Sequence, residues 1–294
     1  MGEALATRLV AKNWNVALFD VSEKAGSKLG MTTLDSPLSH LPSTYTVSAG
    51  QLGKNAAFFK ADVASYDSQA HAFKSVWSRW GRIDALLANA GIVDRSSVYI
   101  LKHRGAAVND VPPAPNMACT DVDYKGVVYG TVLATHFMRH NPTPGGKIIA
   151  TASAAGIIPH TTYAEYNGAK AAVITFARGV ADVLYNKDKI AFNVVCPGIV
   201  ATSIIPPEMI AAVSPECLTP VDTIVRAYEE FLDEEEGMGE VRHGQVVEGS
   251  ADKIITLKMP ELGNGRVSQR AVTVWDPLFE MMHGEKSGLP DAIP

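Results

Sequence analysis

Short apolar runs alternate along the chain with longer segments in which apolar residues recur every three or four positions. The apolar runs, each of strand length, are 16–19, 56–59, 83–88, 146–152 and 190–195. The longer segments predict helices over 3–13, 67–80, 118–140 and 162–185. Continuously apolar strands that alternate with helices are typical of a parallel sheet covered on both faces. The pattern therefore predicts an α/β fold of three layers, a doubly wound parallel sheet of the Rossmann type.

Two regions interrupt this alternation. Residues 24–54 are rich in Ser, Gly and Thr and predict an unusually long connection between two strands. Residues 94–117 contain several prolines and predict a loop before the next helix. We interpret residues 1–250 as one domain and residues 251–294 as a C-terminal extension that packs on the same domain.

The pattern becomes looser beyond about residue 204, where prolines are frequent. An acidic helix is predicted to run through residues 229–236. Residues 243–248 form a candidate last strand.

The first predicted element is the helix over 3–13, and no predicted strand precedes it. In a parallel sheet that strand would be central, so its absence would leave the edges of two neighbouring strands unpaired. We therefore expect a sheet that lacks its first strand. Our hypothesis is that the sequence is truncated at its N-terminus and that the chain is prone to aggregate.

The composition narrows the classes of partner. Lys and Arg total 26 against 31 Asp and Glu, a formal net charge of −5, so no basic excess is available to bind a nucleic acid. The sequence contains no run of ~18 apolar residues and no secretory signal pattern at its start. Three cysteines, Cys119, Cys196 and Cys217, match neither a disulfide framework nor a zinc spacing. These observations predict a cytoplasmic protein without a nucleic-acid, membrane or metal partner.

Tyr166 and Lys170 form the strongest candidate pair for proton chemistry. They are four residues apart on the predicted helix over 162–185 and therefore share one face. A phenol with a pKa near ~10 is a poor base at neutral pH, but a neighbouring cation favours the phenolate and makes proton exchange with an alcohol feasible. Tyr163 is an internal comparison, because the residue four positions later is Asn167. The same spacing also arises by chance in helices, and the alternative is a purely structural pair.

Further candidates lie where predicted strands end, which is where open α/β sheets bind their ligands. Ser153 has a hydroxyl that can both donate to and accept from a substrate oxygen; the alternative is an ordinary loop serine. Two further strand ends carry residues that let a ligand approach the backbone, Asn89-Ala90-Gly91 and Pro197-Gly198. The alternative is that both segments are plain turns.

Two carboxylates also follow predicted strands. Asp20 lies 18 residues after Gly2, close to the spacing typical of a carboxylate that binds a ribose. The alternative is a helix N-cap, although Ser22 serves that purpose equally well. Asp62 is positioned to accept a hydrogen bond from an adenine amine, or else to cap the helix that follows.

The order and spacing of these motifs are more specific than any one of them. The matching segments are Leu87-Ala88-Asn89-Ala90-Gly91, Ser153 thirteen residues before Tyr166-Asn167-Gly168-Ala169-Lys170, and Asn193-Val194-Val195-Cys196-Pro197-Gly198 followed by Thr202. Over residues 2–250 the chain resembles the short-chain dehydrogenase/reductase family, in its single-domain branch. With the tail segment 270–275, it looks like the fungal hydroxyprostaglandin-dehydrogenase-like group.

The resemblance implies hydride transfer between a nicotinamide cofactor and a small-molecule secondary alcohol or ketone. By family analogy Tyr166 is the acid/base, Ser153 holds the substrate oxygen, and Lys170 assists Tyr166 and binds the nicotinamide ribose. Apolar residues within 204–213 favour a lipophilic substrate, with lid packing as the alternative. The family also implies a homodimer or homotetramer built on the two long helices.

The resemblance likewise implies which residues bind the cofactor. They are Gly2, Asp20, Asp62, Asn89, Ala90, Gly91, Tyr166, Lys170, Pro197, Gly198, Ile199 and Thr202. Asp20 would accept hydrogen bonds from the ribose hydroxyls of NAD and repel the 2′-phosphate of NADP, so NAD is expected in preference to NADP.

Two departures from the family pattern bear on activity. The fourth catalytic position of the family is an Asn, and Asp123 occupies it here in Val122-Asp123-Tyr124-Lys125-Gly126. An ionised Asp still accepts hydrogen bonds but cannot donate one. The second departure is the glycine loop that precedes the first helix in the family, of which only Gly2 matches.

Two alternatives remain at this point. One is a non-catalytic relative that retains the fold and acts as a binding or regulatory protein, which the incomplete glycine loop favours and the intact Ser153, Tyr166 and Lys170 oppose. The other is the extended branch of the family, which the Asn89-Ala90-Gly91 motif and the lack of a large C-terminal domain oppose.

Overall fold

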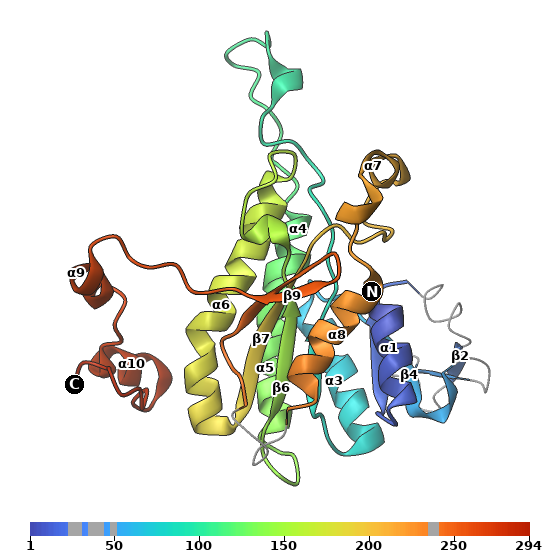
Figure 1. Cartoon of the computed structure of the whole chain (residues 1–294), viewed down its shortest axis with the longest axis vertical. Coiled ribbons are helices and arrows are strands. Elements are labelled where there is room, and N and C mark those ends of the chain that lie inside the picture. Colours follow the sequence, from blue (N-terminus) through green and yellow to red (C-terminus); the bar gives the residue numbers. More distant parts are fainter. Residues whose placement is uncertain (23–30, 35–43, 48–51, 235–240) are drawn as a thin grey trace.

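The computed structural model describes residues 1–294 apart from 23–30, 35–43, 48–51 and 235–240. Its described strands form two sheets that share one three-layer body (Figure 1). The first sheet has the order β1-β4-β3-β2, and the second has the order β5-β6-β7-β8-β9.

In the first sheet, β1 (Val16–Asp20) runs parallel to β4 (Ala56–Lys60), with Val16 opposite Ala56. Two short strands, β2 (Met31–Leu34) and β3 (Thr44–Val47), extend this sheet in antiparallel fashion beyond β4. The unusually long connection predicted over 24–54 therefore contains two strands that the sequence analysis does not predict. These strands are four residues long and rich in threonine, so β-branched propensity favours them although no apolar run marks them.

The second sheet begins with four parallel strands: β5 (Ala85–Ala88), β6 (Gly146–Thr151), β7 (Ile190–Pro197) and β8 (Val246–Ser250). A last strand, β9 (Lys253–Thr256), pairs antiparallel with β8. The candidate strand at 243–248 is thus displaced toward the C-terminus. The antiparallel strands β2, β3 and β9 extend the predicted parallel strands at the outer ends of the two sheets.

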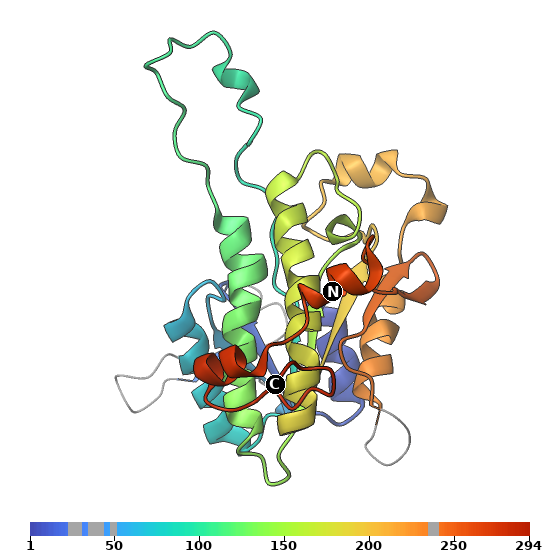
Figure 2. The same cartoon turned by 90° about the vertical axis from the view of Figure 1, so that its left-hand side faces the viewer.

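Helices cover both faces of the two sheets (Figures 1 and 2). On one face lie α1 (Gly2–Ala11) and α8 (Val221–Leu232); on the other lie α3 (Tyr66–Trp80), α5 (Gly126–Met138) and α6 (Ala164–Asp188). Two consecutive residues of β6 lie in the cores on opposite faces of the sheet. Ile148 belongs to the core under α3, α5 and α6, and Ile149 belongs to the core under α1 and α8. This alternation is that of a strand buried on both faces, and it confirms the predicted three-layer architecture.

The predicted helix over 118–140 consists of three consecutive parts. They are α4 (Ala118–Thr120), the π-helical turn η3 (Asp121–Lys125) and α5. A π turn inserts one extra residue into the helix and is common at functional sites. Here it contains Asp123.

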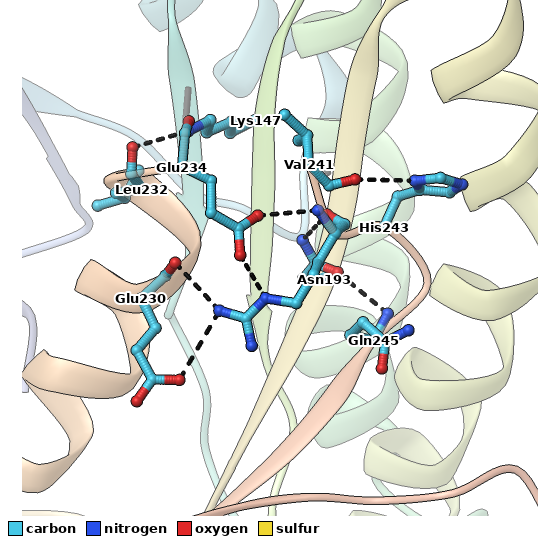
Figure 3. Close-up of polar contacts among 9 residues, drawn as sticks. Lys147, Asn193, Glu230, Leu232, Glu234, Val241, His243 and Gln245 are labelled. Carbon is cyan, nitrogen blue, oxygen red and sulfur yellow. Dashed lines mark hydrogen bonds and ion pairs between the residues drawn. The ribbon is translucent and has the colours of Figure 1, made fainter. Parts of the chain in front are cut away.

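The acidic helix predicted over 229–236 is the end of α8, which begins at Val221 and ends at Leu232. Residues 235–240 lie outside the described part of the chain. The segment that follows is fixed by Asn193 of β7, which is buried and bonded on both sides (Figure 3). Its Nδ2 donates to the carbonyl of Arg242 at 2.7 Å, and its Oδ1 accepts from the N–H of Gln245 at 3.0 Å. Asn193 thereby fixes the backbone that leads into β8.

The remaining described elements are short. They are η1 (Gly53–Asn55), η2 (Leu101–His103), η4 (Ala154–Gly156), α7 (Pro207–Ala212), η5 (Pro215–Cys217), α9 (Gly265–Arg270) and α10 (Asp276–His283). The predicted loop over 94–117, which contains η2, projects far from the body in both views (Figures 1 and 2). Within the described residues, the search for a helix long and apolar enough to cross a membrane finds none.

Candidate active site

The carboxyl ends of β5, β6 and β7 meet at one edge of the second sheet. The register sets Ala88 opposite Ala150, and Thr151 opposite Val195. The segments that continue from these strands therefore begin side by side. They carry Asn89, Ser153 and Gly198, as the sequence predicts.

A buried lysine lies at the centre of this edge. Lys170 of α6 is 3% exposed, and its Nζ donates to the carbonyl of Thr151 at 2.8 Å. The same Nζ lies 5.5 Å from the ring centroid of Tyr166, one helical turn away. The predicted shared face of Tyr166 and Lys170 is thus present, and Tyr166 itself is half-buried.

Asp123 reaches the same ammonium from the π turn. Its Oδ2 lies 3.0 Å from Lys170 Nζ, and its Oδ1 accepts from the N–H of Ile92 at 2.8 Å. Its side chain is fully buried, and this burial raises the pKa of the carboxyl group although Lys170 and the Ile92 N–H act in the opposite direction. The residue that departs from the family pattern is therefore an ion-pair partner of the central lysine.

Two glycines are required by the close packing around this pair. A Cβ at Gly91 would lie 2.9 Å from Asp123 Oδ2 and 3.3 Å from Lys170 Nζ. A Cβ at Gly156, in η4, would lie 2.8 Å from the backbone carbon of Lys170. The second contact shows that the turn after Ser153 lies directly against α6.

Ser153 is the residue before η4 and is half-buried. Its Oγ accepts from the N–H of Ala155 at 3.1 Å, which orients the hydroxyl. A serine Oγ accepting one such bond can still donate its own hydrogen to a substrate oxygen. This geometry suits the predicted role of Ser153.

Asp94, which is not among the predicted site residues, holds the start of α6. Its two carboxylate oxygens accept from the N–H groups of Glu165 at 3.0 Å and Tyr166 at 2.8 Å. These are orphan donors of the first helical turn, so Asp94 positions the backbone of Tyr166. The sequence gives no signal for this, because 71 and 72 residues separate the partners.

Tyr228 of α8 is a second residue that the sequence analysis missed. It is fully buried, burial raises its pKa, and its hydroxyl contacts the Thr151 hydroxyl directly. The carbonyl of Thr151 accepts a hydrogen bond from Lys170. Tyr228 therefore helps to position Thr151, and Thr151 positions the Lys170 ammonium.

Three potential metal ligands also lie near this edge. The ligand atoms of Asp94, Cys119 and Glu165 are all within 4.8 Å of one another. Asp94 is engaged at the start of α6, and Glu165 accepts from the N–H of Thr120 at 2.8 Å. Burial raises the pKa of the Cys119 thiol to about 12, which keeps it protonated, so these groups are better explained as helix-end contacts.

The other predicted cofactor residues lie along the same edge. Asp20 ends β1 and is exposed, with Oδ1 accepting from the N–H of Ser22 at 2.7 Å. Asp62 is exposed, and its Oδ1 accepts from the N–H of Ala64 at 2.9 Å, which is a turn contact. The N-cap of α3 is Ser65, so Asp62 does not cap this helix. A Cβ at Gly2 would lie 3.3 Å from Asn89 Nδ2, so α1 begins beside the end of β5.

The segment after β7 completes the edge. Pro197 is buried, and the N–H of Gly198 donates to the carbonyl of Gly249 at 2.8 Å. Ile199 bridges to Leu218, and both Ile199 and Thr202 are half-buried. Ala90 is exposed.

Known proteins resemble this chain in both sequence and fold. The short chain dehydrogenase family matches residues 1–209. The short-chain dehydrogenase/reductase prx6 of Penicillium rubens is 52% identical over 294 residues, which is 100% of this chain and 91% of that protein. The mouse (Mus musculus) 15-hydroxyprostaglandin dehydrogenase (NAD(+)) is 27% identical over 207 residues, 70% of this chain and 65% of that protein. The solved structure of 3-ketoacyl-(acyl-carrier-protein) reductase from Brucella melitensis complexed with NADH has a TM-score of 0.65 at 18% identity, covering 85% of this chain and 91% of that chain.

The fold and the site together define an α/β oxidoreductase. The family match and the 52% identical relative show which one: the chain belongs to the short-chain dehydrogenase/reductase family. The resemblance inferred from the sequence is thereby confirmed. The similarity to the hydroxyprostaglandin-dehydrogenase group is distant, at 27% identity.

Proposed function

We propose that this protein is an NAD(H)-dependent oxidoreductase that interconverts a secondary alcohol and a ketone. The observation that carries the proposal is the arrangement around Lys170, whose buried ammonium lies under the Tyr166 ring at the edge that also holds Ser153. Alcohol oxidation requires a base that accepts the hydroxyl proton, and a phenol next to a fixed cation is suited to that task.

The side chains divide the proton chemistry among them. The Ser153 hydroxyl donates to the substrate oxygen and orients it toward Tyr166. The Tyr166 hydroxyl takes the proton from an alcohol, or gives one to a ketone oxygen, while the Lys170 charge stabilises the phenolate. The Thr151 carbonyl and Asp123 hold the ammonium in place. A bound nicotinamide accepts or supplies the hydride.

The residues at this edge fit such a cofactor in part. Two described oxygens contact the Lys170 ammonium, which has three hydrogens to donate, so one donor remains for a ribose hydroxyl. The exposed Asp20 carboxylate suits the second ribose and favours NAD, because it would repel a 2′-phosphate. α1 begins at Gly2, and the free N–H groups of a first helical turn are suited to bind a pyrophosphate.

We further propose a lipophilic substrate and a homo-oligomer. Apolar side chains of the segment 204–210 are half-buried near the same edge, and Ile157 and Ile158 are exposed beside it. The long helices α5 and α6 lie side by side on one face, and Val132 on α5 is 53% exposed, which suits packing against a second copy (Figure 2).

The second candidate function is a non-catalytic relative that binds a ligand without turnover. The observation that favours it is the division of the sheet between β1 and β5, next to where a dinucleotide would lie.

The test is a comparison of two tyrosine variants in the full chain. Tyr166→Phe should abolish NAD-linked oxidation of secondary alcohols while NAD affinity, measured by nucleotide fluorescence, stays nearly unchanged. Tyr163→Phe is the matched control and should have a mild effect, since its ring lies beside Tyr166 but has no cation four residues later. Equal losses in both variants at equal folding would refute the assignment, and a wild-type chain that binds no dinucleotide would favour the non-catalytic alternative.

A further inference from the structure

Asp123 and Lys170 form an ion pair that is buried in the protein. Oδ2 of Asp123 lies 3.0 Å from Nζ of Lys170, and the two side chains are 0% and 3% exposed. The N–H of Ile92 donates to the other carboxylate oxygen at 2.8 Å, so both oxygens have a partner that favours the ionised form. Salt screens buried charges much less than exposed ones, so each charge of this pair acts strongly on its neighbours.

Tyr166 is one of these neighbours. The Lys170 ammonium lies 5.5 Å from the centroid of the Tyr166 ring, and the Asp123 carboxylate is in direct contact with the same ammonium. A cation beside a phenol favours the phenolate, and an anion next to that cation reduces the effect. The electrostatic influence on Tyr166 is therefore that of the ion pair and not that of the lysine alone.

Three other titratable groups lie beside this pair. The carboxylates of Asp94 and Glu165 accept hydrogen bonds from backbone N–H groups at helix ends, and their negative charge acts in the same direction as that of Asp123. Burial raises the pKa of the Cys119 thiol to about 12, so this group carries no charge. Among the ion pairs of the described residues, that of Lys170 is with Asp123.

The two directions of the proposed reaction need Tyr166 in opposite states, and the inference rests on the proposed function at this point. In reduction, the Tyr166 hydroxyl gives its proton to the ketone oxygen while hydride reaches the carbonyl carbon from the reduced nicotinamide. In oxidation, the Tyr166 phenolate takes the proton of the alcohol while hydride leaves the same carbon for the oxidised nicotinamide. An unopposed ammonium favours the phenolate and hence oxidation, whereas an ammonium with a counter-ion favours the phenol and hence reduction.

We propose that Asp123 is the counter-ion of Lys170 and biases this protein toward ketone reduction at neutral pH. Asp123 is a positioning residue, because it acts through the lysine and also holds the ammonium in place. Alcohol oxidation then requires a more alkaline pH. The balance between the two directions at a given pH depends on the charge of one residue in the π turn η3.

The test compares the wild type with Asp123→Asn, which removes the charge and preserves the size of the side chain. The first readout is the ultraviolet absorbance of the Tyr166 phenolate as the pH is raised, in the full chain without substrate or cofactor. Its signal is the difference between each protein and the same protein carrying Tyr166→Phe, which removes the contribution of the other tyrosines. The second readout is the pH profile of cyclohexanol oxidation with NAD and of cyclohexanone reduction with NADH.

We expect the Tyr166 phenolate to form in Asp123→Asn at a pH about one unit lower than in the wild type, because an unopposed charge at this distance shifts an ionisation by ~1–3 units. The pH of half-maximal oxidation should fall by the same amount. The ratio of oxidation to reduction at neutral pH should rise about tenfold. A loss of stability alone would lower both rates without moving either midpoint.

Asp121→Asn is the matched control on the same π turn. Asp121 pairs with Lys125, but these side chains are 45% and 40% exposed, so water and salt screen their charges. Neither readout should change in this variant. A shift equal to that of Asp123→Asn would show a general effect of charge on the turn and would refute the proposal.

A double variant, Asp123→Asn with Lys170→Met, serves if the single variant does not fold, because it leaves neither charge of the pair buried alone. If Asp123 offsets Lys170, the phenolate forms in this variant within about half a pH unit of the wild type. An unchanged phenolate midpoint in Asp123→Asn, or a midpoint at least about one unit higher in the double variant, refutes the proposal. The absorbance needs no substrate, so it decides the role of Asp123 even if neither cyclohexanol nor cyclohexanone is converted.

Discussion

Gly91 passes the buried Asp123–Lys170 pair so closely that we predict Gly91→Ala will damage both stability and turnover. The added Cβ would lie 2.9 Å from Asp123 Oδ2 and 3.3 Å from Lys170 Nζ. Neither group can withdraw easily. Asp123 is held by the Ile92 N–H at 2.8 Å, and the ammonium by the Thr151 carbonyl at 2.8 Å.

The size of the effect follows from this crowding. Overpacking a well-packed interior costs ~1–3 kcal/mol, and we expect about 2 kcal/mol here because the displaced atoms belong to a buried ion pair. The same shift moves the ammonium relative to Tyr166. A misplacement of ~1 Å in a catalytic group lowers turnover by roughly a hundredfold, so activity should fall further than stability alone would explain.

Gly168→Ala is the matched control. Gly168 lies in α6 between Tyr166 and Lys170, is exposed, and among the described atoms a Cβ there would have no neighbour within 4 Å. Replacing a helical glycine by alanine should stabilise the protein by ~0.5–1 kcal/mol and leave turnover unchanged. The assay is urea unfolding of both variants alongside steady-state rates. A Gly91→Ala protein as stable as the wild type would refute the close approach on which the site geometry depends.

Three further outcomes are expected. Asp94→Ala should lower the free energy of unfolding by about 1–2 kcal/mol through loss of the cap on α6, and Asp94→Asn should recover part of it; an unchanged denaturation midpoint in the alanine variant would contradict the capping role. Burial raises the pKa of Asp123, so the native protein keeps the proton on this carboxyl group at pH values where the unfolded chain has lost it. The protonated Asp123 therefore stabilises the native state fully below the ordinary pKa of 3.8, and this stabilisation is lost as the pH rises through the native pKa. The free energy of unfolding of the wild type, relative to Asp123→Asn, should therefore fall as the pH rises above 3.8, and a relative rise would show the opposite shift. Burial raises the thiol pKa of both Cys119 and Cys196 to about 12, whereas Cys217 is exposed, so a thiol reagent should modify one cysteine in the native protein and three after unfolding.

Much of the architecture is determined by local sequence and can be predicted from it. Five largely apolar runs of strand length predicted the parallel core, because a strand buried on both faces is apolar at most positions. The helical spacing of Tyr166 and Lys170 fixed their shared face regardless of the surrounding fold. The short strands β2 and β3 escaped prediction because more than half of their residues are threonine or tyrosine, so no apolar run marks them.

The environment of the lysine was decided only by the tertiary structure. Asp123, Gly91 and Thr151 approach Lys170 from three separate segments of the chain, and no spacing in the sequence encodes those distances. The same holds for Asp94, whose carboxylate caps a helix that begins some seventy residues later. The division of the described strands into two sheets, and the packed helices that join these sheets into one body, appear only in the tertiary structure. The spacing of apolar residues indicates which face of a helix or strand is buried. The residues that contact this face depend on how elements distant in the sequence pack together.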